Sequence, residues 1–124
     1  MDKPPLNNIV SRIKHTSIKG ELMEIVREVA RKNAAVIFTK SWCCMCHSMK
    51  ALLYELGASP AVYELDQHVN GTQMEWGLRA LGCCPVVPVV FIGGTLVGSA
   101  EDIISLHVDG SLKHMLINAK AIWL

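Results

Sequence analysis

The sequence predicts a single α/β domain in which helices flank a mixed four-stranded sheet. Apolar runs at helical spacing alternate with short β-branched runs in the order αβαβαββα, and no repeat or linker interrupts them. The length of 124 residues suits one domain. Hydrophobic residues make up 51% of the chain and charged residues 19%, which predicts a compact core rather than disorder.

The first half of the chain predicts two helices and two strands in alternation. Residues 20–32 carry apolar side chains at helical spacing and end in basic residues that suit a helix C-terminus. Residues 35–39 form a β-branched apolar run, typical of a strand covered on both faces. A polar, cysteine-rich bend over 40–46 leads into a helix that ends at Gly57, and residues 61–65 form the second strand.

The second half predicts a helix, a hairpin and a helical C-terminal region. The spacing of Thr72 and Glu75 matches a capping box and opens a helix that ends at Gly82. Residues 89–97 predict a β-hairpin, because two glycines stand at its centre and can take the positive φ angles of a tight turn. The last expected features are a helix capped by Ser99 and Asp102, a break at Gly110 and an amphipathic stripe through Leu112, Met115, Leu116 and Ala119.

Charge and hydropathy exclude several classes of function. The chain has 12 basic and 11 acidic residues, so it lacks the basic surplus of a direct nucleic-acid binder. Its longest apolar run, residues 86–92, is far too short to span a membrane. Residues 1–16 are expected to be a flexible leader without a signal peptide, followed by the domain at 17–120. A reducing compartment is therefore expected, where cysteines serve redox chemistry or metal binding.

The strongest chemical signal is Cys43-x-x-Cys46 between a buried strand and a helix. This spacing lets the two sulfurs meet within disulfide geometry, which predicts a redox-active Cys43–Cys46 disulfide. The first sulfur faces the free N–H groups of the helix N-terminus, which with Lys40 favour the nucleophilic thiolate at Cys43. Cys46, one turn into the helix, is expected to be buried and to act as the resolving thiol. After a strand, this motif indicates thioredoxin-type redox chemistry.

Other interpretations of the cysteines remain open at this stage. The same motif followed by His47 matches a c-type haem attachment site, although such attachment requires export. Structural zinc would need a second ligand pair, and Cys83-Cys84 are adjacent rather than separated by two residues. For Cys44, Cys83 and Cys84 the preferred interpretation is that they are small buried hydrophobic residues.

Two further segments are candidates for ligand binding. A cis Val87–Pro88 bond opposite the cysteines would expose the Val87 backbone, which could pair with an extended, peptide-like ligand. In residues 98–102 a glycine turn meets a helix N-terminus, and beside the cysteine motif this favours an anion site for a carboxylate.

Together, these segments resemble the successive glutathione-site motifs of glutaredoxins. The resemblance lies in residues 40–46, 86–94 and 97–102 and extends from about Gly20 to the last residue. The double cysteine, residues 81–85 and the terminal Ala121, Ile122, Trp123 and Leu124 are similar to the CC-type subclass of land plants.

This resemblance implies a thioredoxin-like glutaredoxin fold and a glutathione-dependent thiol–disulfide oxidoreductase. Its substrates would be low-molecular-weight disulfides and disulfide or glutathionylated proteins, with Cys43 and Cys46 as the catalytic thiols. The helix position that often binds the glycyl carboxylate of glutathione falls on Met74, with Gln73 and Arg79 as substitutes. The implied glutathione-binding residues are Lys40, Val87, Pro88, Ala100 and Glu101.

The resemblance also implies partners beyond glutathione. The terminal residues 121–124 would form an interaction motif for basic-leucine-zipper transcription factors of the TGA type or for a co-repressor, in the cytoplasm and nucleus. Either the tail folds back onto the core, or it extends the amphipathic stripe and presents Trp123 to a partner. The alternative functions are a non-catalytic transcriptional adaptor and a carrier of a 2Fe–2S cluster that Cys43 and glutathione hold across a dimer.

Overall fold

The computed structural model describes residues 18–83 and 86–122. The expected leader at 1–16, Cys84, Pro85, Trp123 and Leu124 lie outside the described residues. Within the described residues, nine elements follow one another: α2 (Ile18–Arg31), β1 (Ala35–Thr39), α3 (Cys44–Glu55), β2 (Ala61–Glu64), α4 (Gly71–Ala80), β3 (Val89–Ile92), β4 (Thr95–Gly98), α5 (Ala100–Asp109) and α6 (Ser111–Asn118). No helix in this part of the chain is long and apolar enough to cross a membrane.

The four strands form one mixed sheet in the order β2-β1-β3-β4. β1 pairs in parallel with β2 and antiparallel with β3, and β3 and β4 form the predicted hairpin. Gly93 and Gly94 take φ angles of 61° and 81° at its turn, the conformation that favours glycine. The predicted fold class, an α/β domain with a mixed four-stranded sheet and flanking helices, is confirmed.

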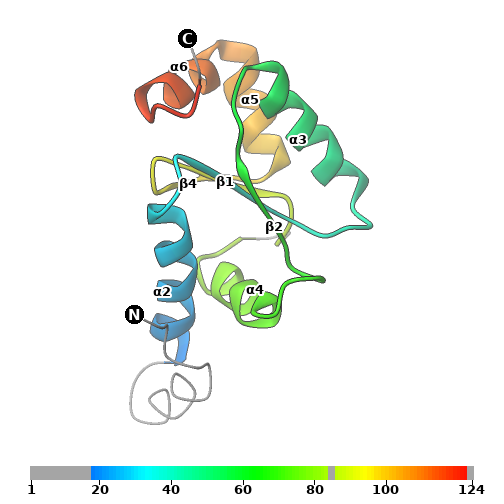
Figure 1. The fold of residues 1–124 in the computed structure, drawn as a ribbon, viewed down its shortest axis with the longest axis vertical. Coiled ribbons are helices and arrows are strands. Elements are labelled where there is room, and N and C mark those ends of the chain that lie inside the picture. The colour runs from blue at the N-terminus through cyan, green and yellow to red at the C-terminus, as the bar shows by residue number, and fades with distance from the viewer. Residues whose placement is uncertain (1–17, 84–85, 123–124) are drawn as a thin grey trace.

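Helices cover both faces of the sheet, with α3, α5 and α6 on one side and α2 and α4 on the other (Figure 1). Side chains alternate along β1: Ile37 packs against the first group of helices, and Phe38 packs against the second. Every residue of β1 is buried, as its apolar sequence with several β-branched residues predicts. The end of this buried strand therefore provides a rigid base for the cysteine motif that follows it.

Two details differ from the sequence-based expectations. α4 begins at Gly71 with Asn70 as its N-cap, so Thr72 and Glu75 do not form the predicted capping box. The tail does not extend the stripe of α6, because Lys120 takes a left-handed φ of 59° and the chain turns back. The expected cap of α5 is present: Asp102 Oδ2 accepts a hydrogen bond from the Ser99 backbone N–H at 3.0 Å.

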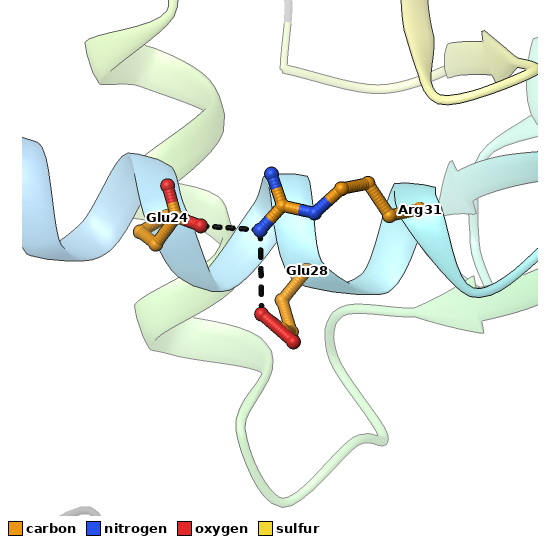
Figure 2. Close-up of polar contacts among 3 residues, drawn as sticks. All are labelled: Glu24, Glu28 and Arg31. Atoms are coloured by element: carbon orange, nitrogen blue, oxygen red, sulfur yellow. Dashed lines mark hydrogen bonds and ion pairs between the residues drawn. The ribbon is translucent and has the colours of Figure 1, made fainter.

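The outer face of α2 carries an exposed ion-pair cluster. The Arg31 guanidinium lies between the carboxylates of Glu24 and Glu28, at 3.3 Å from the latter (Figure 2). All three side chains are about half exposed, so these pairs contribute little to stability.

Helices α2 and α4 approach closely at Gly77. A Cβ atom added there would lie 2.3 Å from the carbonyl oxygen of Leu22 and 2.7 Å from a methyl group of Val26. The backbone of α2 cannot yield as a flexible side chain would. Glycine at this position therefore permits the contact that holds α4 against the domain.

We expect Gly77→Ala to lower the free energy of unfolding by about 1–3 kcal/mol, because the added methyl group separates the two helices. Helix propensity alone predicts the opposite, a gain of about 1 kcal/mol. Chemical denaturation distinguishes the two, with Ser105→Ala at an exposed position of α5 as the control. A more stable Gly77→Ala protein would contradict the close packing.

Candidate active site

Cys43 is the N-cap residue of α3, and its sulfur faces the first turn of the helix. The Cys46 backbone N–H donates a hydrogen bond to Cys43 Sγ at 3.1 Å. The free N–H groups and the dipole of a helix N-terminus stabilise negative charge at this position. Cys43 is partly exposed, so its sulfur lies at a helix N-terminus and is also accessible from solvent.

Cys46 lies in the opposite environment. Its side chain is 1% exposed. The pKa of this thiol is raised from 9.0 to about 12, mainly by burial and then by a side-chain hydrogen bond with Cys43. Cys46 is therefore a protonated thiol at neutral pH, next to the sulfur that reacts.

The loop between β1 and α3 is anchored by a residue that follows β2. Asp66 accepts hydrogen bonds from the Ser41 backbone N–H, at 3.1 Å, and from the Ser41 hydroxyl. These bonds, led by that from the hydroxyl, hold the pKa of the Asp66 carboxyl below its usual range. Within the loop, the Cys43 N–H donates to the Lys40 carbonyl at 3.0 Å. Cys43 is thus held both by the first turn of α3 and by the hydrogen bonds of the loop that precedes it.

A cavity of about 620 Å³ opens beside Cys43. Its lining combines the cysteine loop, the end of α4 and the segment before β3. The lining residues are Lys40, Trp42, Cys43, Glu75, Arg79, Gly82, Cys83, Val86 and Val87. It is large enough for a peptide-sized ligand next to the reactive sulfur.

Charged side chains meet on one wall of this cavity. Glu75 Oε1 lies 3.0 Å from Lys40 Nζ, and Glu75 Oε2 lies 2.8 Å from an Arg79 guanidinium nitrogen. Lys40 Nζ also lies 5.6 Å from the centre of the Trp42 ring, within cation–π range. Hydrogen bonds from Arg79 and then Lys40 hold the pKa of Glu75 below its usual range, so it is ionised at neutral pH.

Comparison with known proteins identifies the family. The family model described as Glutaredoxin matches residues 35–97. The chain is 66% identical to Glutaredoxin-C11 of Arabidopsis thaliana over 103 residues, which are 82% of this chain and all of the relative. The chain belongs to the glutaredoxin family. Putative glutaredoxin-C12 of the same plant is 63% identical over 103 residues, which are again 82% of this chain and all of the relative.

Solved glutaredoxin structures share this fold. The crystal structure of the buckwheat glutaredoxin–glutathione complex superimposes with a TM-score of 0.78 at 31% identity, covering 87% of this chain and 98% of the buckwheat chain. The family and the thioredoxin-like fold inferred from the sequence motifs are thereby confirmed.

The structure brings together part of the predicted glutathione site. Lys40, Cys43 and Val87 line the cavity, and the Val87–Pro88 peptide bond is cis. Ala100 and Glu101 lie in the first turn of α5, outside the residues that line the cavity.

On α4, Arg79 lines the cavity, whereas Met74 is 2% exposed and belongs to the core. Gln73 is partly buried and is not among the residues that line the cavity. Of the substitutes considered for Met74, the geometry therefore favours Arg79. The sequence motifs do not indicate Glu75 as a cavity residue, because its spacing from Thr72 suggests a capping role.

The other cysteines differ from one another. Cys44 is exposed, so the expectation that it is a small buried hydrophobic residue is wrong. It lies in the first turn of α3, where its side chain points away from the packed face. Cys83 is partly buried and lines the cavity, and burial raises the pKa of its thiol.

Within the described residues, a single chain does not supply a complete ligand set for an iron–sulfur cluster. Within residues 18–83 and 86–122, no group of three or more His, Cys, Asp or Glu side chains could hold a metal ion. Cys43 could supply the one thiolate per chain that a cluster held across a dimer by Cys43 and glutathione would need.

We expect Cys46 to resist alkylation near neutral pH. Its pKa is raised from 9.0 to about 12, which lowers its thiolate fraction about a thousandfold at pH 8. The alkylation rate of Cys46 should rise with pH up to about 12, since deprotonation of its thiol creates the nucleophile. Iodoacetamide labelling followed by peptide mass spectrometry measures this, with exposed Cys44 as the control thiol. Equal labelling rates for Cys44 and Cys46 at pH 8 would contradict the described environment.

Proposed function

We propose that this glutaredoxin is a glutathione-dependent thiol–disulfide oxidoreductase that reduces glutathionylated proteins and small disulfides. The observation that carries the proposal is the Cys43 sulfur at the N-terminus of α3, which accepts a hydrogen bond from the Cys46 N–H and opens onto a cavity with cationic residues. The buckwheat relative that superimposes on this chain was solved as a glutathione complex, which supports glutathione as the co-substrate.

The reaction proceeds by two disulfide exchanges. The Cys43 thiolate attacks the glutathione sulfur of a mixed disulfide, which forms a Cys43–glutathione disulfide and releases the substrate thiolate. A second glutathione thiolate then attacks the glutathione sulfur of this adduct. The Cys43 thiolate is released together with glutathione disulfide. Each turnover therefore consumes one free glutathione, and the other half of the glutathione disulfide comes from the substrate.

Cys46 is poorly suited to compete with glutathione for the second step. Its thiol is buried and protonated at neutral pH. We therefore propose that external glutathione resolves the adduct. Cys46 serves mainly with protein disulfides, where the Cys43–Cys46 disulfide forms after Cys46 is deprotonated.

Substitution of each thiol tests this division. Cys43→Ser should reduce turnover of a glutathionylated substrate to the uncatalysed background, because the nucleophile is lost. Cys46→Ser should retain most of that turnover and lose most of the reduction of protein disulfides. The assay couples glutathione, glutathione reductase and NADPH, with Cys44→Ser as the matched thiol control. Full activity of Cys43→Ser, or equal loss of both activities in Cys46→Ser, would contradict the proposal.

We also propose an adaptor role toward TGA-type basic-leucine-zipper transcription factors, in the cytoplasm and nucleus. The support is the similarity of residues 121–124 to the CC-type terminal motif. A further observation is the apolar surface of α5, where Ile104 is 43% and Val108 is 79% exposed. α5 contacts α6, the helix that leads to the tail.

The tail divides into a packed part and a terminal part. The Ala121 N–H donates to the Leu116 carbonyl at 2.8 Å, and Ile122 pairs with Ala58 in an antiparallel bridge. Both residues pack against the core on the α3 side of the sheet, so they contribute to the stability of the domain. Any contact made by Trp123 and Leu124 lies outside the described residues.

Two truncations separate partner binding from stability. Removal of residues 123–124 should abolish binding to a purified TGA-type protein in a pull-down and leave glutathione-linked turnover unchanged. Removal of 121–124 should also lower the melting temperature by several degrees, because Ile122 and its bridge are lost. Unchanged partner binding after the shorter truncation would refute the adaptor role of the tail.

A further inference from the structure

Glu75 bridges the two cationic groups that line the cavity beside Cys43. One carboxylate oxygen pairs with Lys40 at 3.0 Å, and the other pairs with Arg79 at 2.8 Å. Both oxygens of this carboxylate therefore face cations within the chain itself.

These contacts are only partly screened by water. The side chains of Lys40 and Glu75 are 20% and 22% exposed, whereas that of Arg79 is 53% exposed. An ion pair at this depth is held more firmly than one on the open surface, but a ligand can still reach it. Its geometry is that of a carboxylate bound between a lysine and an arginine, with the carboxylate supplied by the protein.

A ligand in this cavity that carries a carboxylate would pair with the same two cations, Lys40 and Arg79. Glutathione has two carboxylates and one ammonium group, so its net charge is negative near neutral pH. To pair with Lys40 or Arg79, a carboxylate of glutathione must either displace the Glu75 carboxylate or bind next to its negative charge. A thiol without a carboxylate meets no such competition.

We propose that Glu75 is a specificity-determining residue of this cavity: it competes with the carboxylate of glutathione for Lys40 and Arg79 and so lowers the preference of Cys43 for glutathione over uncharged thiols. The inference rests on the proposed function, since it concerns glutathione bound beside Cys43. It assigns to α4 a role that limits glutathione binding.

A different role for Glu75 would leave a different signature. If Glu75 serves to hold Lys40 in a binding position, its removal weakens the adduct with glutathione. If it acts on the Cys43 sulfur itself, its removal changes every mixed disulfide to the same extent. Competition for the cations predicts a gain that is confined to ligands with carboxylates.

The test measures mixed-disulfide equilibria in a Cys46→Ser background, where no Cys43–Cys46 disulfide forms. The Cys43 thiolate exchanges with glutathione disulfide to give the Cys43–glutathione adduct and one glutathione thiolate. The same exchange is measured with bis(2-hydroxyethyl) disulfide, which carries no charge. Intact-protein mass spectrometry gives both constants, and peptide mapping assigns the adduct to Cys43.

We expect Glu75→Gln to raise the equilibrium constant for formation of the Cys43–glutathione adduct about three- to tenfold. The size of this gain reflects the loss of one partly exposed ion pair that competes with the ligand. The constant for the uncharged disulfide should change less than about twofold. Glu75→Ala should act in the same direction, and equal melting temperatures establish that the fold is kept. Glu28→Gln is the matched control, because it removes an ion-paired carboxylate of α2 outside the cavity (Figure 2).

The possible results separate the two proposals. An equal rise for both disulfides, no change in either, or a fall in the glutathione constant would overturn the role of Glu75 and leave the proposed function standing. Failure of glutathione disulfide to form any adduct on Cys43 of the parent protein would overturn the proposed function itself and the inference that rests on it.

Discussion

The hydrogen bond from the Cys46 backbone N–H to the Cys43 sulfur is the contact on which the site depends. It makes Cys43 the N-cap of α3, so one residue both begins the helix and receives its free N–H groups. The fully buried strand β1 and the Asp66–Ser41 bonds hold the preceding loop against this helix. A small displacement of that loop would remove the sulfur from the N–H groups that stabilise its negative charge.

The two cysteines of one motif have different chemistry because helix geometry gives them different surroundings. Cys43 lies at the helix end and lines the cavity, whereas Cys46 points into the core three residues later. Burial keeps the Cys46 thiol protonated, so it favours a route in which an external thiol completes the reaction. The cavity also discriminates between ligands with and without carboxylates, since its cations Lys40 and Arg79 are already paired with Glu75.

Much of the fold could be predicted because local sequence and tertiary packing agree. The alternation of apolar periods, the β-branched run of β1 and the paired glycines before β4 each suit one kind of element. The position of Cys43 followed from the motif and the strand before it. In each of these cases, neighbours in sequence determine the local structure.

The remaining features depend on contacts between distant residues. Glu75 stands at capping-box spacing from Thr72, but its ion pair with Lys40 joins α4 to the loop after β1 and has no local signature. Gly77 likewise has a role only because α2 crosses there. The apolar stripe of α6 gave no sign that the chain reverses at Lys120 and returns Ile122 to Ala58.

The most direct measurement is the site of the first glutathione adduct. The fully reduced protein would be exposed briefly to glutathione disulfide near neutral pH, quenched with acid and mapped by peptide mass spectrometry. We predict that glutathione appears first on Cys43, ahead of exposed Cys44 and buried Cys46. A first adduct on Cys44 or Cys46, with Cys43 unmodified, would contradict it.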